Sequence, residues 1–338
     1  MKILLHTNAL NERGTTVAIR DYAHGLSMRG IKVSIAYCSE DETNVSDVEC
    51  QMRNEFEIYG YSDFQSFTRQ NSRVWDLAYF MKYGYNDGKL MPNIPNIVHA
   101  VFQSYDPHGE AYLYISEWLA RKMRIKNLKN IAKLSRKGLN SLKGKNFNYL
   151  PHIVDLPLSA KNMRAIWQIP EDALVGGRHG AMNTFDVPMV HRTVHQLLSE
   201  YTNLYFVFAN TNRFINHPRV KFLPKLMSRI ETREYLSSLD FYIHARHRGE
   251  TFGLSLLEAM LCKIPVFSFS GGVDGNHRHL LKNSQNSLFH TAEQLSNGIR
   301  DLSDYGDVES NFQIASVFSP DSVMEQWSTL LTELMSTH

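Results

Sequence analysis

The spacing of apolar residues changes repeatedly along the chain between the alternation of a strand and the period of a helix. Residues 2–7 form a short apolar run, residues 15–29 place apolar side chains at near-helical spacing, and residues 31–37 alternate. Gly30 separates the predicted helix from the second strand. This order of elements predicts a βαβ unit and therefore a parallel sheet.

The same kinds of element recur over most of the remaining chain. Further strands are predicted at 94–102, 111–116, 148–150, 174–177, 204–209, 219–223, 241–244 and 264–269, and helices from 116 or 117 onward and at 187–199, 229–238, 254–262 and 321–335. Residues 40–90 are rich in aromatic side chains and show no readable period, so we assign them no role.

Prolines between 151 and 170 mark a linker between two sets of alternating elements. We therefore predict an α/β protein with Rossmann-like domains at 1–152 and 153–320, facing each other across a deep cleft, and a C-terminal helix at 321–338 that can cross back. In open α/β sheets ligands bind at the carboxyl ends of the strands, so the loops there are the candidate site.

Composition removes several classes of function. The net charge is +2, with 36 Lys and Arg against 34 Asp and Glu, so we predict no nucleic-acid partner. Three widely spaced cysteines, Cys38, Cys50 and Cys262, favour free thiols in a reducing, cytoplasmic setting. No apolar run approaches the roughly 18 residues of a membrane span.

The positive charge is concentrated in residues 121–145, which hold ten Lys or Arg and no Asp or Glu. An amphipathic helix there could contact an anionic membrane and make the protein peripheral to it. The plainer alternative is a solvated helical face on the first domain.

The most informative segment is 248–269. Glu258 is the only charged residue between Glu250 and Lys263, in an otherwise apolar predicted helix that follows the turn Thr251–Phe252–Gly253. A buried carboxylate needs a partner, and the free amides of a helix start favour a phosphate. Two interpretations stay open: Glu258 binds the ribose of a nucleoside diphosphate, or it pairs with a neighbouring Arg or His inside the core.

This segment resembles the signature of retaining glycosyltransferases of the GT-B fold, in particular family 4, in which two glutamates are separated by seven residues. Matching positions are Glu250, Phe252, Gly253, Glu258, Ala259 and Met260. Further similar stretches are 13–16 (RGTT), 115–120 (ISEWLA), 151–155 (PHIVD) and 176–178 (GGR).

The resemblance implies an acceptor-binding first domain and a second domain that binds a nucleotide sugar, carrying UDP or GDP, as co-substrate without a cofactor or metal. It implies catalytic roles for Glu250, His108 and His99, acceptor contacts for Arg13 and Thr16, and donor contacts for Arg178, Arg246, Arg248, Thr251, Phe252, Gly253, Leu254, Glu258, Gly14 and Thr15. The implied reaction transfers the sugar with retention to a glycan, glycolipid or glycoprotein.

One position departs from the family pattern. Asn183 stands where a Lys that grips the diphosphate is usual, and His179, Arg192, Arg246 or Arg248 could replace that charge. The departure keeps open a catalytically silent nucleotide- or sugar-binding protein on the same fold. A sugar-nucleotide epimerase of the same fold is a further alternative. His99 and His108 could equally be structural histidines.

Overall fold

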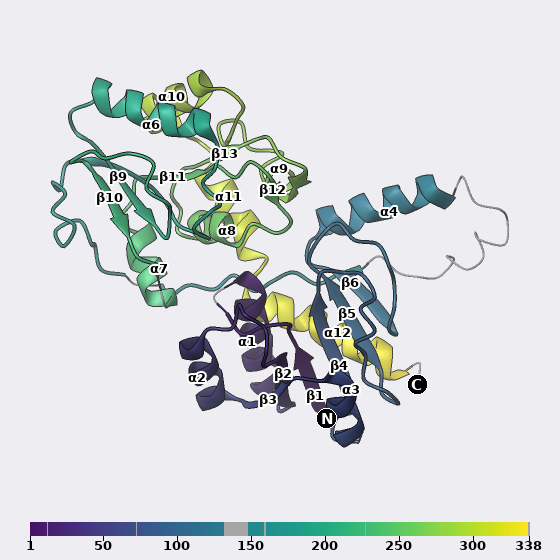
Figure 1. Ribbon diagram of the computed structural model, residues 1–338. Helices are drawn as coiled ribbons and strands as arrows, with labels where there is room; N and C mark the ends of the chain where they lie inside the picture. The colour runs from purple at the N-terminus through teal and green to yellow at the C-terminus, as the bar shows by residue number, and fades with distance from the viewer. Residues whose placement is uncertain (12, 72, 132–147, 159, 227, 337–338) are drawn as a thin grey trace. The chain divides into compact units, whose positions relative to one another are not determined.

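In the computed structural model the chain divides into two compact units (Figure 1). Met1–Ile153 and Pro320–His338 form the first unit, and Val154–Ser319 form the second. The structure describes residues 1–336 except 12, 72, 132–147, 159 and 227. Each unit is described by itself below.

The first unit contains a seven-stranded sheet in the order β3-β2-β1-β4-β5-β6-β7, and every pairing is parallel. Its strands are β1 (Lys2–His6), β2 (Lys32–Cys38), β3 (Glu57–Tyr61), β4 (Leu77–Lys82), β5 (Asn96–Ala100), β6 (Ala111–Tyr114) and β7 (Asn148–Tyr149). Its helices are α1 (Gly14–Ser27), α2 (Ser46–Glu55), α3 (Phe64–Gln70), α4 (Glu117–Ile131) and α12 (Pro320–Ser336).

The core of the first unit lies around the central strands, which are covered on both faces. Every residue of β4 and β5 is buried. Trp327 of α12 lies fully buried with its ring centroid 4.8 Å from that of Tyr79 on β4 and 5.6 Å from that of Tyr22 on α1. The C-terminal helix is therefore part of the first unit's core.

The second unit contains a six-stranded parallel sheet in the order β10-β9-β8-β11-β13-β15. Its strands are β8 (Leu174–Arg178), β9 (Leu204–Ala209), β10 (Val220–Leu223), β11 (Phe241–His244), β13 (Val266–Phe269) and β15 (Leu288–Phe289), with a separate parallel pair β12 (Gly249–Glu250) and β14 (Asp274–Gly275). Its helices are α6 (Pro188–Glu200), α7 (Arg229–Leu236), α8 (Leu254–Leu261), α9 (Asn276–Leu280), α10 (Ala292–Arg300) and α11 (Val308–Ser316), with a short 3₁₀ turn at Leu302–Asp304.

Each main sheet reverses its strand order once. The reversal lies between β1 and β4 in the first unit and between β8 and β11 in the second. At such a point the loops from neighbouring strands lead away in opposite directions, which leaves room for a ligand at the carboxyl ends. These two places carry the candidate sites discussed below.

The predicted α/β class, with two parallel sheets, is confirmed. Residues 40–90, which gave no readable pattern, contain α2, β3, α3 and β4. Of the basic run, 121–131 belong to α4, whereas 132–147 lie outside the described residues. No helix in the described part of the chain has the length and apolar content that crossing a membrane requires.

Candidate active site

Several titratable side chains of the second unit lie where its sheet reverses. Arg178 ends β8 and is followed by His179, and His244 ends the neighbouring strand β11. The chain then runs through β12 into the start of α8, which carries Glu258. Side chains far apart in the sequence are thus brought to one edge of one sheet.

Glu258 pairs with a histidine inside the unit. Its Oε2 lies 2.8 Å from Nε2 of His179, and its side chain is 17% exposed. Oε1 has no hydrogen-bond partner among the described residues. Of the two interpretations above, the structure shows the internal pairing, and it also leaves one carboxylate oxygen of a partly accessible side chain for another donor. Glu258 is half-buried and lies on the less buried side of α8.

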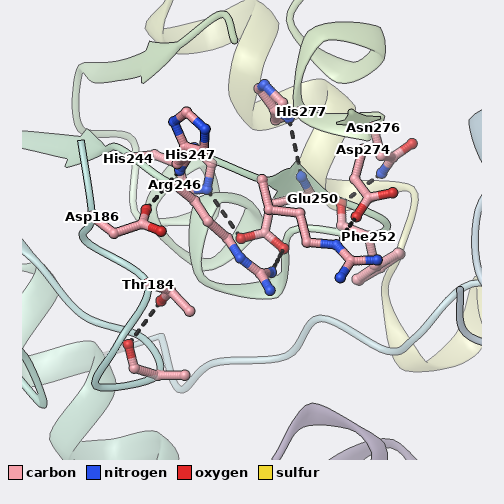
Figure 2. Close-up of polar contacts among 12 residues, drawn as sticks. Thr184, Asp186, His244, Arg246, His247, Glu250, Phe252, Asp274, Asn276 and His277 are labelled. Carbon is pink, nitrogen blue, oxygen red and sulfur yellow. Dashed lines mark hydrogen bonds and ion pairs between the residues drawn. The ribbon is translucent and has the colours of Figure 1, made fainter. Parts of the chain in front are cut away.

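Glu250 contacts two basic side chains at once (Figure 2). Its Oε1 lies 3.2 Å from Nε2 of His244, and Arg246 donates from Nη1 to Oε2 at 2.8 Å. His244 is oriented in turn by Ser268, whose hydroxyl lies 2.8 Å from Nδ1. Burial raises the pKa of Glu250, but the bond to His244 and the charges of His244 and Arg246 lower it by more, so the carboxyl ionises below its usual range.

The backbone around Glu250 is fixed by a close approach between β12 and β14. Gly249 has a φ of 79°, and a Cβ there would lie 1.9 Å from the carbonyl oxygen of Asp274. Arg248 donates from Nε to Oδ2 of the buried Asp274 at 2.7 Å, and the Glu250 amide donates to Nδ1 of His277 at 3.3 Å. Figure 2 shows His277 and Asp274 beside Glu250.

The start of α8 presents backbone amides without a side-chain cap. Gly253 is the N-cap residue and no acidic residue lies in the first turn, which begins at the half-buried Leu254. The turn ahead of it is held by Asn276, whose Nδ2 donates to the Phe252 carbonyl at 2.5 Å, while Thr251 is half-buried. Uncapped amides and the helix dipole together favour an anion at this end.

Arg178 serves the fold of the second unit. It is 4% exposed, and its guanidinium donates to the Asn210 carbonyl, the Thr211 hydroxyl, the Ala181 carbonyl and the Thr184 hydroxyl. Burial lowers its pKa. The predicted donor-phosphate contact is thus replaced in this structure by contacts that tie the loop after β8 to the loop after β9.

Asn183, at the position where a lysine is usual, makes a hydrogen bond to another neutral side chain. Oδ1 of Asn183 accepts a hydrogen bond from Nδ2 of Asn212 at 2.7 Å. Of the four residues considered as replacements, His179, Arg246 and Arg248 each pair with a carboxylate, and Arg192 is exposed on α6.

The predicted residues of the first unit lie at the start of α1, which follows β1. Arg13 is an exposed N-cap residue without a side-chain capping bond, Gly14 has open space around it, and Thr15 is half-buried. Thr16 is buried; its hydroxyl accepts from the Asn11 amide at 3.2 Å and donates to the Ala9 carbonyl at 3.3 Å. Thr16 therefore shapes the turn, and the prediction that it contacts the acceptor is corrected.

The two candidate catalytic histidines, His99 and His108, differ in burial. His99 is fully buried on β5, its Nδ1 hydrogen-bonds to the Tyr79 hydroxyl, and burial lowers its pKa to about 3. It is a core residue, so the prediction of a catalytic His99 is wrong. His108 is half-buried, with Nδ1 2.6 Å from the Asp106 carbonyl and Nε2 3.4 Å from Nζ of Lys82.

Sequence reasoning missed three members of the cluster around Glu250. These are His277 and Asp274 beside Glu250, and Asp186, which contacts the preceding loop because its Oδ1 accepts from the His247 amide at 2.6 Å (Figure 2). Asp274 and His277 closely follow the Gly271–Gly272 pair at the end of a buried strand. That position was the one available signal, since loops after parallel strands meet at one edge.

We compared the chain with known protein families, curated proteins and solved structures. Residues 213–316, which contain both glutamates and α8, match the family model described as glycosyl transferases group 1. The predicted resemblance is thereby confirmed. A comparison of the sequence with curated proteins gives no match.

Solved structures resemble the chain over nearly its whole length. HepE from Anabaena, solved in complex with UDP-glucose, aligns with a TM-score of 0.72 at 15% identity and covers 98% of this chain and 100% of its own. Sucrose-phosphate synthase from Thermosynechococcus elongatus aligns with a TM-score of 0.68 at 14% identity, with 100% of both chains covered. A complex of TarM from S. aureus with UDP aligns with a TM-score of 0.66 at 9% identity, covering 97% of this chain and 99% of that one. The chain has the GT-B fold.

Proposed function

We propose that this protein is a retaining glycosyltransferase that moves a sugar from a nucleoside diphosphate to a hydroxyl group of a glycan, glycolipid or glycoprotein. The observation that carries the proposal is the cluster at the reversal of the second sheet. There the uncapped start of α8, Glu258 with one unpaired oxygen, and the ionised Glu250 all belong to one segment of 12 residues from Gly249 to Met260. That segment lies within the part of the chain that matches the family model.

Each group has a chemical task that its surroundings suit. The amides at the start of α8 would receive the diphosphate, because they combine free donors with the positive end of the helix dipole. Oε1 of Glu258 would accept a hydrogen bond from a ribose hydroxyl, while His179 keeps Oε2 in place. Arg246 uses one guanidinium donor on Glu250 and is 28% exposed, so its remaining donors suit a phosphate oxygen.

Glu250 is unsuited to donating a proton at neutral pH, since its pKa is lowered. It would instead accept hydrogen bonds from the transferred sugar and stabilise positive charge that develops on the ring. In the reaction that the resemblance implies, the bond from the anomeric carbon to the diphosphate oxygen breaks with its electron pair. The acceptor oxygen then bonds to the same face of that carbon, and its proton passes to the departing phosphate.

The donor would carry uridine or guanosine, and UDP is the first candidate because HepE and TarM were solved with UDP. Thermal unfolding in the presence of UDP, GDP and their sugar conjugates tests the proposal. A ligand at 100 times its dissociation constant should stabilise the protein by about 2.7 kcal/mol. Glu258→Ala should lose this stabilisation, and Glu309→Ala, which removes an exposed carboxylate paired with Lys263, should keep it.

Turnover separates the proposal from its two alternatives. A glycosyltransferase releases free nucleoside diphosphate and forms a product with the donor's anomeric configuration, which NMR reads directly. Nucleotide binding without release would instead show a silent binding protein, and a product that keeps its nucleotide would show an epimerase. Equal stabilisation of the Glu258→Ala variant would remove the donor site proposed here.

A further inference from the structure

The loops after β4 and β5 of the first unit expose a set of aromatic rings. Tyr83 is 44% exposed and Tyr85 is 54% exposed. The Tyr83 ring centroid lies 5.2 Å from that of Tyr85 and 4.7 Å from that of Phe102. We call Tyr83, Tyr85 and Phe102 the aromatic platform. It directly follows β4, one of the two strands at the reversal of the first sheet.

Hydrogen bonds and close packing hold the loop that carries the aromatic platform. The Phe102 amide donates to the Tyr83 carbonyl at 3.3 Å, the Asn86 amide donates to Oδ2 of Asp106 at 2.8 Å, and the Tyr112 hydroxyl donates to the Gly84 carbonyl. Gly84, with a φ of 126°, packs so closely that a Cβ would lie 2.9 Å from the Cβ atoms of Ala100 and Ser104. The exposed rings therefore stand on a fixed loop, and binding would cost little ordering entropy.

The chemistry of the platform fits a sugar ring. A pyranose has an apolar C–H face surrounded by hydroxyl groups, and a tyrosine likewise offers an apolar face with a polar tip. The hydroxyls of Tyr83 and Tyr85 make no hydrogen bond to any residue that the structure describes. They are therefore available to the hydroxyl groups of a bound sugar.

Two other classes of occupant fit less well. A stable protein interface needs about 800 Å² on each partner, which is more than three rings provide. An anionic lipid would need a cation beside the rings, but Lys82, at the end of β4, is buried and commits its Nζ to Asp87 at 2.6 Å and to the Lys89 carbonyl at 2.7 Å.

We propose that the aromatic platform binds a pyranose ring of a carbohydrate acceptor by stacking on Tyr83 and Tyr85. The proposal rests on the proposed function and narrows it, because it selects a glycan, or the glycan part of a conjugate, as the group that the first unit recognises.

Saturation-transfer NMR on the full chain, with a set of methyl hexopyranosides and disaccharides, tests the platform directly. We expect transfer to the ring C–H protons in the wild type. In the Tyr83→Ala/Tyr85→Ala double variant the dissociation constant should rise by about tenfold or more. Tyr83→Phe should retain most of the affinity, and Tyr149→Ala, which removes a 38% exposed tyrosine from β7 of the same unit, should bind as the wild type does.

Thermal stabilisation by UDP, measured on the same variants, separates this proposal from the donor site. Unchanged UDP stabilisation together with lost glycoside binding supports the platform. Equal glycoside binding by the double variant and the wild type overturns it, as does the absence of saturation transfer in the wild type. Loss of binding to phosphatidylglycerol vesicles in the double variant, with no glycoside signal, would identify a lipid surface instead. Glycoside binding without any nucleotide response would uphold the platform and reject the transferase.

Discussion

The buried histidines on or near the strands of the two main sheets have different partners, although both sheets are parallel and reverse once. In the first unit His6, His99 and His152 are buried, and burial lowers their pKa values to about 3, 3 and 4. In the second unit His179 and His244 each contact a glutamate, at 2.8 and 3.2 Å. One sheet uses imidazoles as neutral core groups, and the other uses them to hold carboxylates at its carboxyl edge.

This difference shows which side chains can take part in chemistry. A neutral imidazole among Tyr22, Tyr79 and Trp327 contributes ring packing and cannot reach a ligand. A carboxylate held by a histidine from one side keeps oxygen lone pairs for a ligand on the other. The second unit therefore carries an ionic candidate site, and the first unit presents aromatic surface in the corresponding position after β4.

The largest expected effect comes from the ionic cluster. Glu250→Gln keeps the size of the side chain but removes the charge that faces Arg246 and His244 and that would stabilise the transition state. We expect turnover to fall by about a thousandfold, within the range for loss of one preorganised electrostatic group. The measurement is release of nucleoside diphosphate, with Glu309→Gln as the matched surface control. Near-normal turnover would show that Glu250 only supports the loop.

Acidification should weaken the first unit through its neutral histidines. Their folded pKa values lie below the unfolded value of about 6.5, so between these limits the unfolded chain binds more protons and stability falls as pH falls. The expected loss is about 1.4 kcal/mol per pH unit for each histidine between pH 6 and 5. Hydrogen exchange of β4 and β5 amides as a function of pH measures it. If the pH dependence of β5 exchange is the same in His99→Leu as in the wild type, His99 is not neutral in the folded state.

A substitution of Arg178 tests whether this cation, at the reversal of the second sheet, stabilises the fold or binds the ligand. Arg178→Ala removes a buried guanidinium from two carbonyls and two hydroxyls. Leaving such acceptors unsatisfied should cost about 3 kcal/mol in the free energy of unfolding by urea. The exposed Arg13→Ala in the first unit should change that free energy little. Unaltered stability of Arg178→Ala with weaker UDP binding would return Arg178 to the phosphate role predicted from the sequence.

Two glycines give a smaller contrast between the units. Gly249→Ala would place a methyl group 1.9 Å from the Asp274 carbonyl oxygen at a φ of 79°, whereas Gly14→Ala meets open space at the start of α1. We expect a loss of about 2 kcal/mol for the first substitution and a change within about 0.5 kcal/mol for the second. Urea unfolding measures both free energies. Equal effects would show that β12 and β14 can move apart to accommodate the added methyl group at little cost.

Much of this architecture could be predicted from apolar spacing. The run 2–7 and the stretch 204–209 gave strands because buried parallel strands are nearly continuous in apolar residues. Within residues 40–90, β3 is only partly buried and α3 is seven residues long, so neither gave a pattern; β4 was missed although it is a buried and mostly apolar strand. Short elements contain too few periods to be recognised.

The site was less predictable than the fold. The motif located Glu250 and Glu258, but the identity of their partners depends on strand order, which brings His179 and His244 to neighbouring strand ends. His99 and Arg178 are of residue types that often take part in catalysis or binding, yet both are buried and make their contacts inside their own unit. Burial distinguishes such structural residues from functional ones. A single sequence does not show whether an isolated polar side chain is buried.

The central claim is that Glu258 receives the ribose of a nucleoside diphosphate while His179 holds its other oxygen. A crystal structure of the protein with UDP tests it most directly. The account predicts a ribose hydroxyl within hydrogen-bond distance of Oε1 of Glu258, the diphosphate at the amides that begin α8, and His179 still bonded to Oε2. UDP bound at any other place, with both oxygens of Glu258 closed to it, would contradict the account.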